Sequence, residues 1–191
     1  MTQEEFIGVL DEKGYSYKIE GDKLVVTRKG YVDLNSLTSL PPDVEFRNKG
    51  DVYLSSLTSL PPGAEFRNKG FVDLELIESI PPDTEFRNEG DVYLESLKTL
   101  PPDTIFGNRI WGVYLESLKT ISPGVEFKNQ GGVFLNSLET ISPGVVFKNR
   151  WRVRSNSLFD GFLDDWSGNI EGIGSNRLLN KMISDGLFDR R

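Results

Sequence analysis

Carboxylates are the side chains of this chain that could do acid–base chemistry. The 191 residues include 29 Asp and Glu, no Cys and no His. Without Cys or His there is no thiol nucleophile, no disulfide, no Cys- or His-ligated metal and no Ser-His-Asp or Cys-His mechanism. Asp33 and Asp73 could form an inverting pair like that of glycan-cleaving β-helices, since strand spacing puts them roughly 10 Å apart. They belong to an alternating column and to no singular acidic cluster, so we expect a protein without enzymatic activity, metal or cofactor.

The net charge and the hydropathy of the chain limit the classes of partner it is expected to bind. The formal net charge is -7, which disfavours direct binding of a polyanion such as nucleic acid. No stretch approaches the roughly 20 apolar residues that span a bilayer, so we expect no membrane partner. The acidic start, Met1 to Glu5, lacks the basic and apolar regions of a secretory signal, and we therefore expect a cytoplasmic protein.

The elements that must position any site are copies of a 20-residue repeat. The unit GYVDLNSLTSLPPDVEFRNK begins at Gly30 and recurs from Gly50, Gly70 and Gly90. One residue is inserted near Arg109-Ile110-Trp111, and the pattern resumes at Gly112 and Gly132, with a degraded last copy near Val153. A unit this short buries its apolar residues only by stacking, so the period predicts a solenoid. The glycines fall at turns and make no phosphate-binding motif.

Each repeat carries two strand signals. The Val-Xaa-Leu segment at Val32 to Leu34 has period two and predicts a short strand with one face buried. After the Pro-Pro or Ser-Pro break, the Glu-Phe-Arg segment predicts a second strand with Phe in the core. An Asn follows each Phe, and we expect this column to satisfy backbone groups at a turn: Asn48, Asn68, Asn88, Asn108, Asn129 and Asn149.

The expected fold is mainly β: a single-domain β-solenoid with 20-residue coils and helical N- and C-terminal caps. Residues 1–29 form the N-terminal cap, with a helix opened by the Thr2–Glu5 capping box and a hairpin around Gly21-Asp22. Residues 30–153 form the repeats. Residues 154–191 form a C-terminal cap with a helix opened by Ser175, through which two copies of the chain could associate.

The repeat phrase Leu37-Thr38-Ser39-Leu40-Pro41-Pro42 resembles short bacterial leucine-rich repeats. The match is partial, because Leu34 to Leu37 is two residues shorter than in those repeats and the recurrent Asn follows Phe instead. The whole unit resembles Ser-Leu-Thr-Ser-Leu-Pro repeat proteins of bacteria and their phages, largely uncharacterised. The resemblance implies a solenoid with an interaction role and, for a phage or mobile-element member, inhibition of a bacterial defence protein.

The candidate binding residues are those that vary along the rod or break its period. The outward position of the Val-Xaa-Leu strand gives one column, and the position two residues later gives an acidic neighbour. We expect contacts with a protein partner at Tyr53, Asp73, Tyr93, Tyr114 and Phe134 in the first column and at Glu95 and Glu116 in the second. Two tryptophans beside arginines, Trp111 and Trp151, stand at equivalent corners and complete the predicted site.

Other interpretations remain open. Tyr is also common at exposed strand positions, and Trp111 could simply fold over the local core. Ordered carboxylates on a rod could mimic DNA, and the same face could bind or cleave a glycan. On the other strand, Glu45, Glu65, Glu85 and Glu126 beside Arg47, Arg67, Arg87, Lys128 and Lys148 predict a solvated ion-pair surface.

Overall fold

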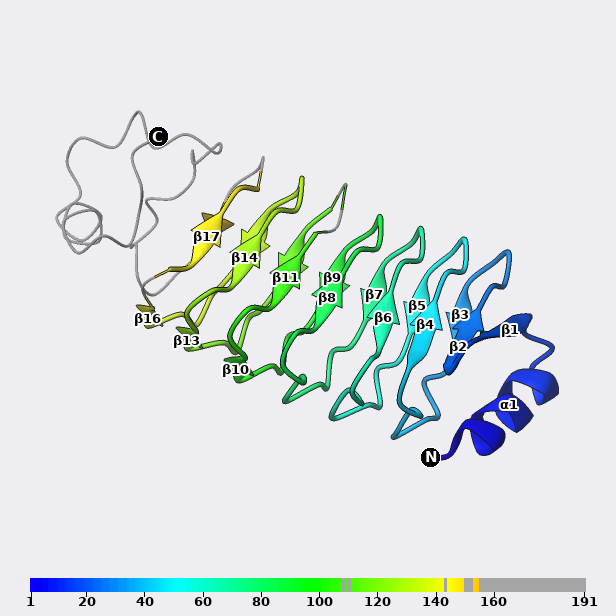
Figure 1. Ribbon diagram of the computed structural model, residues 1–191. Helices are drawn as coiled ribbons and strands as arrows, with labels where there is room; N and C mark the ends of the chain where they lie inside the picture. The colour runs from blue at the N-terminus through cyan, green and yellow to red at the C-terminus, as the bar shows by residue number, and fades with distance from the viewer. Residues whose placement is uncertain (108, 110, 143, 150–152, 155–191) are drawn as a thin grey trace, which may run out of the picture.

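The chain forms a β-solenoid of about 6 turns with coils of about 20 residues, stacked in a row behind one short N-terminal helix (Figure 1). The computed structural model describes residues 1–107, 109, 111–142, 144–149 and 153–154. The predicted C-terminal cap, with its helix and its role in self-association, therefore lies outside the described residues apart from Arg154. No helix within the described ranges is long and apolar enough to cross a membrane.

Three sheets run along the solenoid. We call them the Phe sheet, the Val sheet and the Thr sheet, after the residue that each of their coil strands shares. The Phe sheet contains β1 (Tyr17–Glu20), β2 (Lys23–Val26), β4 (Val44–Phe46), β6 (Glu65–Phe66), β8 (Glu85–Phe86), β11 (Ile105–Phe106), β14 (Glu126–Phe127) and β17 (Val146–Phe147). The Val sheet contains β3 (Val32–Asp33), β5 (Val52–Tyr53), β7 (Val72–Asp73), β9 (Val92–Tyr93), β12 (Val113–Tyr114), β15 (Val133–Phe134) and β18 (Val153–Arg154).

The two predicted strands of each repeat are confirmed, and a third was missed. The Thr sheet contains β10 (Thr99–Leu100), β13 (Thr120–Ile121) and β16 (Thr140–Ile141). These residues precede the prolines, where the sequence pattern indicated only the end of a segment. Strands in successive coils pair in parallel and in register, as Val52 does with Val32 and Val72.

The core is built from identical residues stacked along the axis. Successive Phe rings of the Phe sheet lie parallel, with centroids 5.4 Å apart between Phe46 and Phe66 and 4.9 Å apart between Phe127 and Phe147. The Val and Leu residues of each coil are almost fully buried beside them. Stacked rings add to the burial of apolar area, so one Phe in each coil ties it to both neighbours.

The Asn column is structural, as expected. The Asn48 side-chain amide donates to the carbonyl oxygens of Gly30, Gly50 and Asp51, at 3.2, 2.8 and 3.1 Å. Asn68 repeats the pattern one coil later. Asn48, Asn68 and Asn88 thus each link the corner of their own coil to the corner of the coil before.

The N-terminal cap matches its prediction. Helix α1 (Gln3–Glu12) has the Thr2–Glu5 capping box and buries Phe6 and Leu10 against the first coil. The β1–β2 hairpin adds two strands to the Phe sheet. At the edge of the Val sheet, the Tyr15 hydroxyl lies 3.2 Å from the Asp33 amide and 3.5 Å from its carbonyl oxygen. The cap thus covers the first edge of both long sheets.

The alignment of the later repeats was wrong by one position. Val92 donates to Gly112 as Val72 donates to Asp91, so Gly112 occupies the place of Asp91 and not that of Gly90. The glycine of the next corner is Gly131, and Trp111 is its counterpart one coil earlier. Trp111 therefore stands where the neighbouring coils have a glycine, and the sequence before it is one residue longer than in the other repeats.

Candidate binding face

An unbroken row of aromatic rings runs along the outside of the Val sheet. Neighbouring ring centroids lie 4.5 to 6.1 Å apart over the whole row. The first four rings meet edge to face and the last three stack nearly parallel. We call this the aromatic row; its members are Tyr31, Tyr53, Phe71, Tyr93, Tyr114 and Phe134.

The predicted column gave only part of this row. Tyr31-Val-Asp33 in one coil becomes Asp51-Val-Tyr53 in the next, so ring and carboxylate exchange places. The exchange repeats in the following two coils, and each ring meets the next one diagonally. Tyr31 and Phe71 were therefore missed, although alternation of Gly-Tyr-Val-Asp with Gly-Asp-Val-Tyr in the sequence could have revealed them. Tyr53, Tyr93, Tyr114 and Phe134 lie together as expected.

The aspartates beside the row are held by the backbone. One carboxylate oxygen of Asp51 accepts from the amide of Phe71, one coil on, at 3.0 Å. Asp73 accepts instead from the amide of Glu75, two residues on in its own strand segment, at 3.2 Å. Asp33 and Asp73, the pair considered for glycan hydrolysis, both bond in this second way. The aspartates are therefore fixed structural groups whose remaining oxygen can accept from a partner.

A row of glutamates follows the aromatic row in the third to fifth coils. Burial raises the pKa of Glu95, and the neighbouring carboxylates of Glu75, Glu116 and Asp73 raise it further. Glu95 thus lies in a locally negative environment that costs free energy when it is ionised. The described residues hold no group of three or more acidic side chains arranged to bind a metal ion.

Tyr93 and Tyr114 are neutral at physiological pH, because the pKa of each is raised. Burial raises the pKa of Tyr93 to about 12, with a further contribution from the charge of Asp91. Burial likewise raises the pKa of Tyr114, and Asp91, Glu116 and Glu95 add to the effect. These rings therefore present neutral hydroxyl groups among carboxylates.

Two large apolar side chains are exposed near this face. Trp111 is 57% exposed and Leu76 is 49% exposed. Trp111 is therefore not buried in the local core. Leu76 was missed, and the signal was its place in a row otherwise made of serine: Ser36, Ser56, Ser96, Ser117 and Ser137. Trp151, the predicted counterpart of Trp111, lies outside the described residues.

The outward face of the Val sheet is acidic, unlike that of the Phe sheet. From β3 to β15, the outward positions of the described strands and their flanks carry Asp and Glu but no Lys or Arg. On the Phe sheet, Arg87 pairs with Glu85 at 2.7 Å, and Arg67 pairs with Glu65 at 2.9 Å. The predicted ion pairs are present, but Glu45 is buried and not solvated. Among the described residues, carboxylates without an ion pair are concentrated on the Val sheet.

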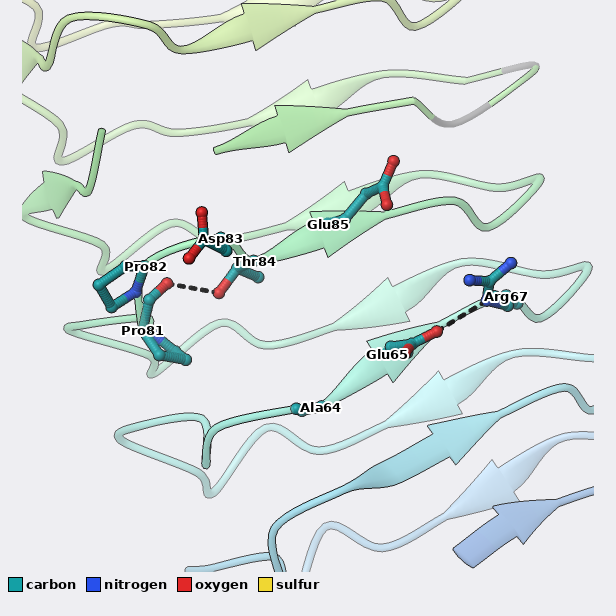
Figure 2. Close-up of a pocket in the computed structure, with 9 residues that line it drawn as sticks. Ala64, Glu65, Arg67, Pro81, Pro82, Asp83, Thr84 and Glu85 are labelled. Carbon is teal, nitrogen blue, oxygen red and sulfur yellow. Dashed lines mark hydrogen bonds and ion pairs between the residues drawn. The ribbon is translucent and has the colours of Figure 1, made fainter. Parts of the chain in front are cut away.

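A shallow pocket of about 150 Å³ lies on the Phe-sheet side, between the second and third coils (Figure 2). It exists because Ala64 is smaller than Val44 and Thr84 at the same place in adjacent coils. Glu65 pairs with Arg67, Glu85 pairs with Arg87, and the Thr84 hydroxyl donates to Pro81 at 2.6 Å. The residues that line this pocket include no aromatic ring, unlike the outward face of the Val sheet.

Comparison of the chain with protein-family models, curated proteins and solved structures finds no significant match.

Proposed function

We propose that this protein is a non-catalytic scaffold that binds another protein through the outward side of the Val sheet. We call this surface the aromatic–acidic face; it comprises the aromatic row and the seven carboxylates Asp33, Asp51, Asp73, Asp91, Glu75, Glu95 and Glu116. The observation that carries the proposal is the unbroken run of six rings among carboxylates that form no ion pair with a Lys or Arg of the described residues. Tyrosine supplies contact area and a polar tip at little entropic cost, which favours protein interfaces.

The ring geometry favours a protein over a glycan. Sugars bind aromatic residues by stacking on an open ring face. Tyr93, Tyr114 and Phe134 lie nearly parallel at 4.9 and 4.5 Å, so each covers its neighbour's face and presents an edge. An edge with a hydroxyl suits side chains and backbone amides of a protein surface.

The biological setting is proposed on the resemblance of the repeats alone. In a phage or mobile element, the partner would be a bacterial defence protein and the chain its cytoplasmic inhibitor. A DNA-mimic form of this inhibition is supported by the consecutive carboxylates of Glu75, Glu95 and Glu116. In that form the partner is itself a nucleic-acid-binding protein, and duplex DNA competes with this chain for it.

Affinity capture tests the proposal. The immobilised protein is exposed to extract of the native host, and bound proteins are identified by mass spectrometry. The variant Tyr93→Ala/Tyr114→Ala and the single variant Trp111→Ala should each lose most of the captured partner. The control Arg87→Ala/Lys128→Ala, on the Phe sheet, should retain it.

The variants must remain folded, so that a loss of capture reports a loss of binding. The double variant loses three ring contacts, each worth about 1 kcal/mol, so it should still unfold cooperatively, roughly 10 °C below the parent. Equal capture by the face variants and the parent would overturn the proposal. Capture of a glycan without any protein would replace it with the carbohydrate-binding alternative.

A further inference from the structure

We propose that the partner of the aromatic–acidic face is an arginine-rich protein segment lying along the solenoid axis. This inference rests on the proposed function and specifies its partner. Its first support is charge complementarity: the face carries seven carboxylates and no Lys or Arg between β3 and β15 in the described part of the chain. A cationic segment is the complement of such a surface, and like charge keeps acidic proteins away.

The ends of the aromatic row show which cation suits it. At the first ring, the Arg28 guanidinium lies 5.1 Å from the Tyr31 centroid and 4.2 Å from that of Tyr15. At the other end, Arg154 of β18 occupies the register position that follows Phe134. The protein itself therefore places arginine at both ends of the row. Guanidinium can stack on a ring and pair with a carboxylate at once, which an ammonium does less well.

The acidic groups are already positioned for such a partner. The backbone amides of Phe71 and Gly112 hold Asp51 and Asp91 by one oxygen each. The Tyr93 hydroxyl also donates to Asp91, at 3.3 Å. Because these carboxylates are fixed before binding, a partner loses little conformational entropy in pairing with them.

The dimensions set the length of the segment. Six rings in adjacent coils span about 24 Å at the usual strand spacing, which an extended segment of about seven residues covers. The centre of this span is Tyr93, where Glu75, Glu95 and Glu116 add their charges. We expect the tightest contact in the third to fifth coils.

Binding of defined peptides to the full chain tests the inference. Fluorescein-labelled peptides of about seven residues, alternating glycine with arginine, lysine or citrulline, match the span of the face. Fluorescence anisotropy at low salt should give the order arginine, then lysine about threefold weaker, with citrulline not bound, because ring stacking adds to pairing. Equal binding of citrulline and arginine peptides would overturn the inference.

Matched variants distinguish binding by the aromatic–acidic face from attraction by the net charge of the protein. Glu75→Gln/Glu95→Gln/Glu116→Gln removes three charges from the face. The control Glu4→Gln/Glu12→Gln/Asp22→Asn removes three from the N-terminal cap. The face variant should bind the arginine peptide about tenfold more weakly, and the control should stay within about twofold of the parent. Similar losses in both variants would mean that net charge alone attracts the peptide.

A third variant tests whether the ring of Tyr93 contributes to the preference for arginine. Tyr93→Leu keeps every carboxylate and should bring the affinities for arginine and lysine peptides together; an unchanged preference would contradict the role of the ring. Failure of these peptide tests leaves the proposed function standing if Tyr93→Ala/Tyr114→Ala still abolishes capture from host extract. Failure of that capture alone removes the proposed function.

Discussion

Individual residues of this protein divide into those that complete a coil and those that weaken it. Asn68 belongs to the first kind: it is fully buried and donates to three backbone carbonyl oxygens. Glu95 belongs to the second kind, because it lies half-buried among other carboxylates. Residues that raise the energy of the folded state without building it are typical of functional surfaces.

Replacement of Asn68 by alanine should be strongly destabilising. The change removes the side-chain hydrogen bonds to the carbonyl oxygens of Gly50, Gly70 and Phe71 and leaves a void in a packed corner, although each oxygen keeps a backbone donor. We expect the free energy of unfolding to fall by about 2 kcal/mol, from hydrogen bonds worth about 1 kcal/mol each. Urea denaturation measures the change, and a loss no larger than that of a control Thr38→Ala, at an exposed position, would contradict the assigned role.

Replacement of Glu95 by glutamine should stabilise the protein at pH 7. Relief of like charge between adjacent strands contributes roughly 0.5 kcal/mol. The raised pKa means that the native state holds the proton more tightly than the unfolded chain. The parent should therefore lose stability as the pH rises from the ordinary value of 4.5 through the raised native pKa of Glu95.

The measurement is thermal unfolding of both proteins across this pH range. Glu95→Gln should lack this pH-dependent loss, while Glu12→Gln on helix α1 should keep it. The groups that face Glu95 are Glu75, Glu116 and Asp73, together with the neutral hydroxyls of Tyr93 and Tyr114. A less stable Glu95→Gln protein at neutral pH would show that the carboxylate has a structural partner.

At the scale of the strand and turn, close contact between corner glycines sets the spacing of the coils. A Cβ added to Gly90 would lie 2.4 Å from the carbonyl carbon of Gly70 and 2.4 Å from the amide nitrogen of Phe71. The obstacle is backbone and cannot rotate away. The corner of Trp111 has one more residue in its sequence than the other corners, so the one large side chain at this position coincides with the insertion.

Two glycine substitutions test this account. Gly90→Ala should destabilise the solenoid by about 3 kcal/mol, because the backbone of the previous coil must move. Gly107→Ala is the matched control, since its nearest atom is the Phe86 carbonyl oxygen at 3.5 Å, an ordinary contact. Chemical denaturation should show the loss at Gly90 alone, and equal stability of the two variants would show that the corners are loosely packed.

Much of the architecture was predictable because each element recurs with the same residues. The period predicted the coils, and the Thr2–Glu5 pair predicted the start of helix α1. The Thr sheet was missed because its strands are two residues long and end at a proline. The diagonal aromatic row was missed because reading one column at a time cannot show that Tyr31 and Tyr53 meet. The register at Gly112 was misread because a glycine there imitates the corner glycine.

The molecule as a whole is a rod with two chemically different long faces. The Phe sheet pairs its charges, as Arg67 does with Glu65. The Val sheet presents rings and carboxylates, and much of the net charge of -7 is unbalanced there. A rigid rod keeps these side chains in fixed register, so under the proposed function we expect the face to bind as one surface and not as independent loops.

Photo-crosslinking in the native host tests directly whether the aromatic–acidic face binds a protein partner. Benzoylphenylalanine replaces Tyr53 or Phe134, which preserves an aromatic ring in the row, and Arg87 on the Phe sheet serves as the control position. We expect irradiation to join both Val-sheet positions to the same partner protein, and we expect no such product at position 87. A partner crosslinked at position 87 and at neither ring would contradict this expectation.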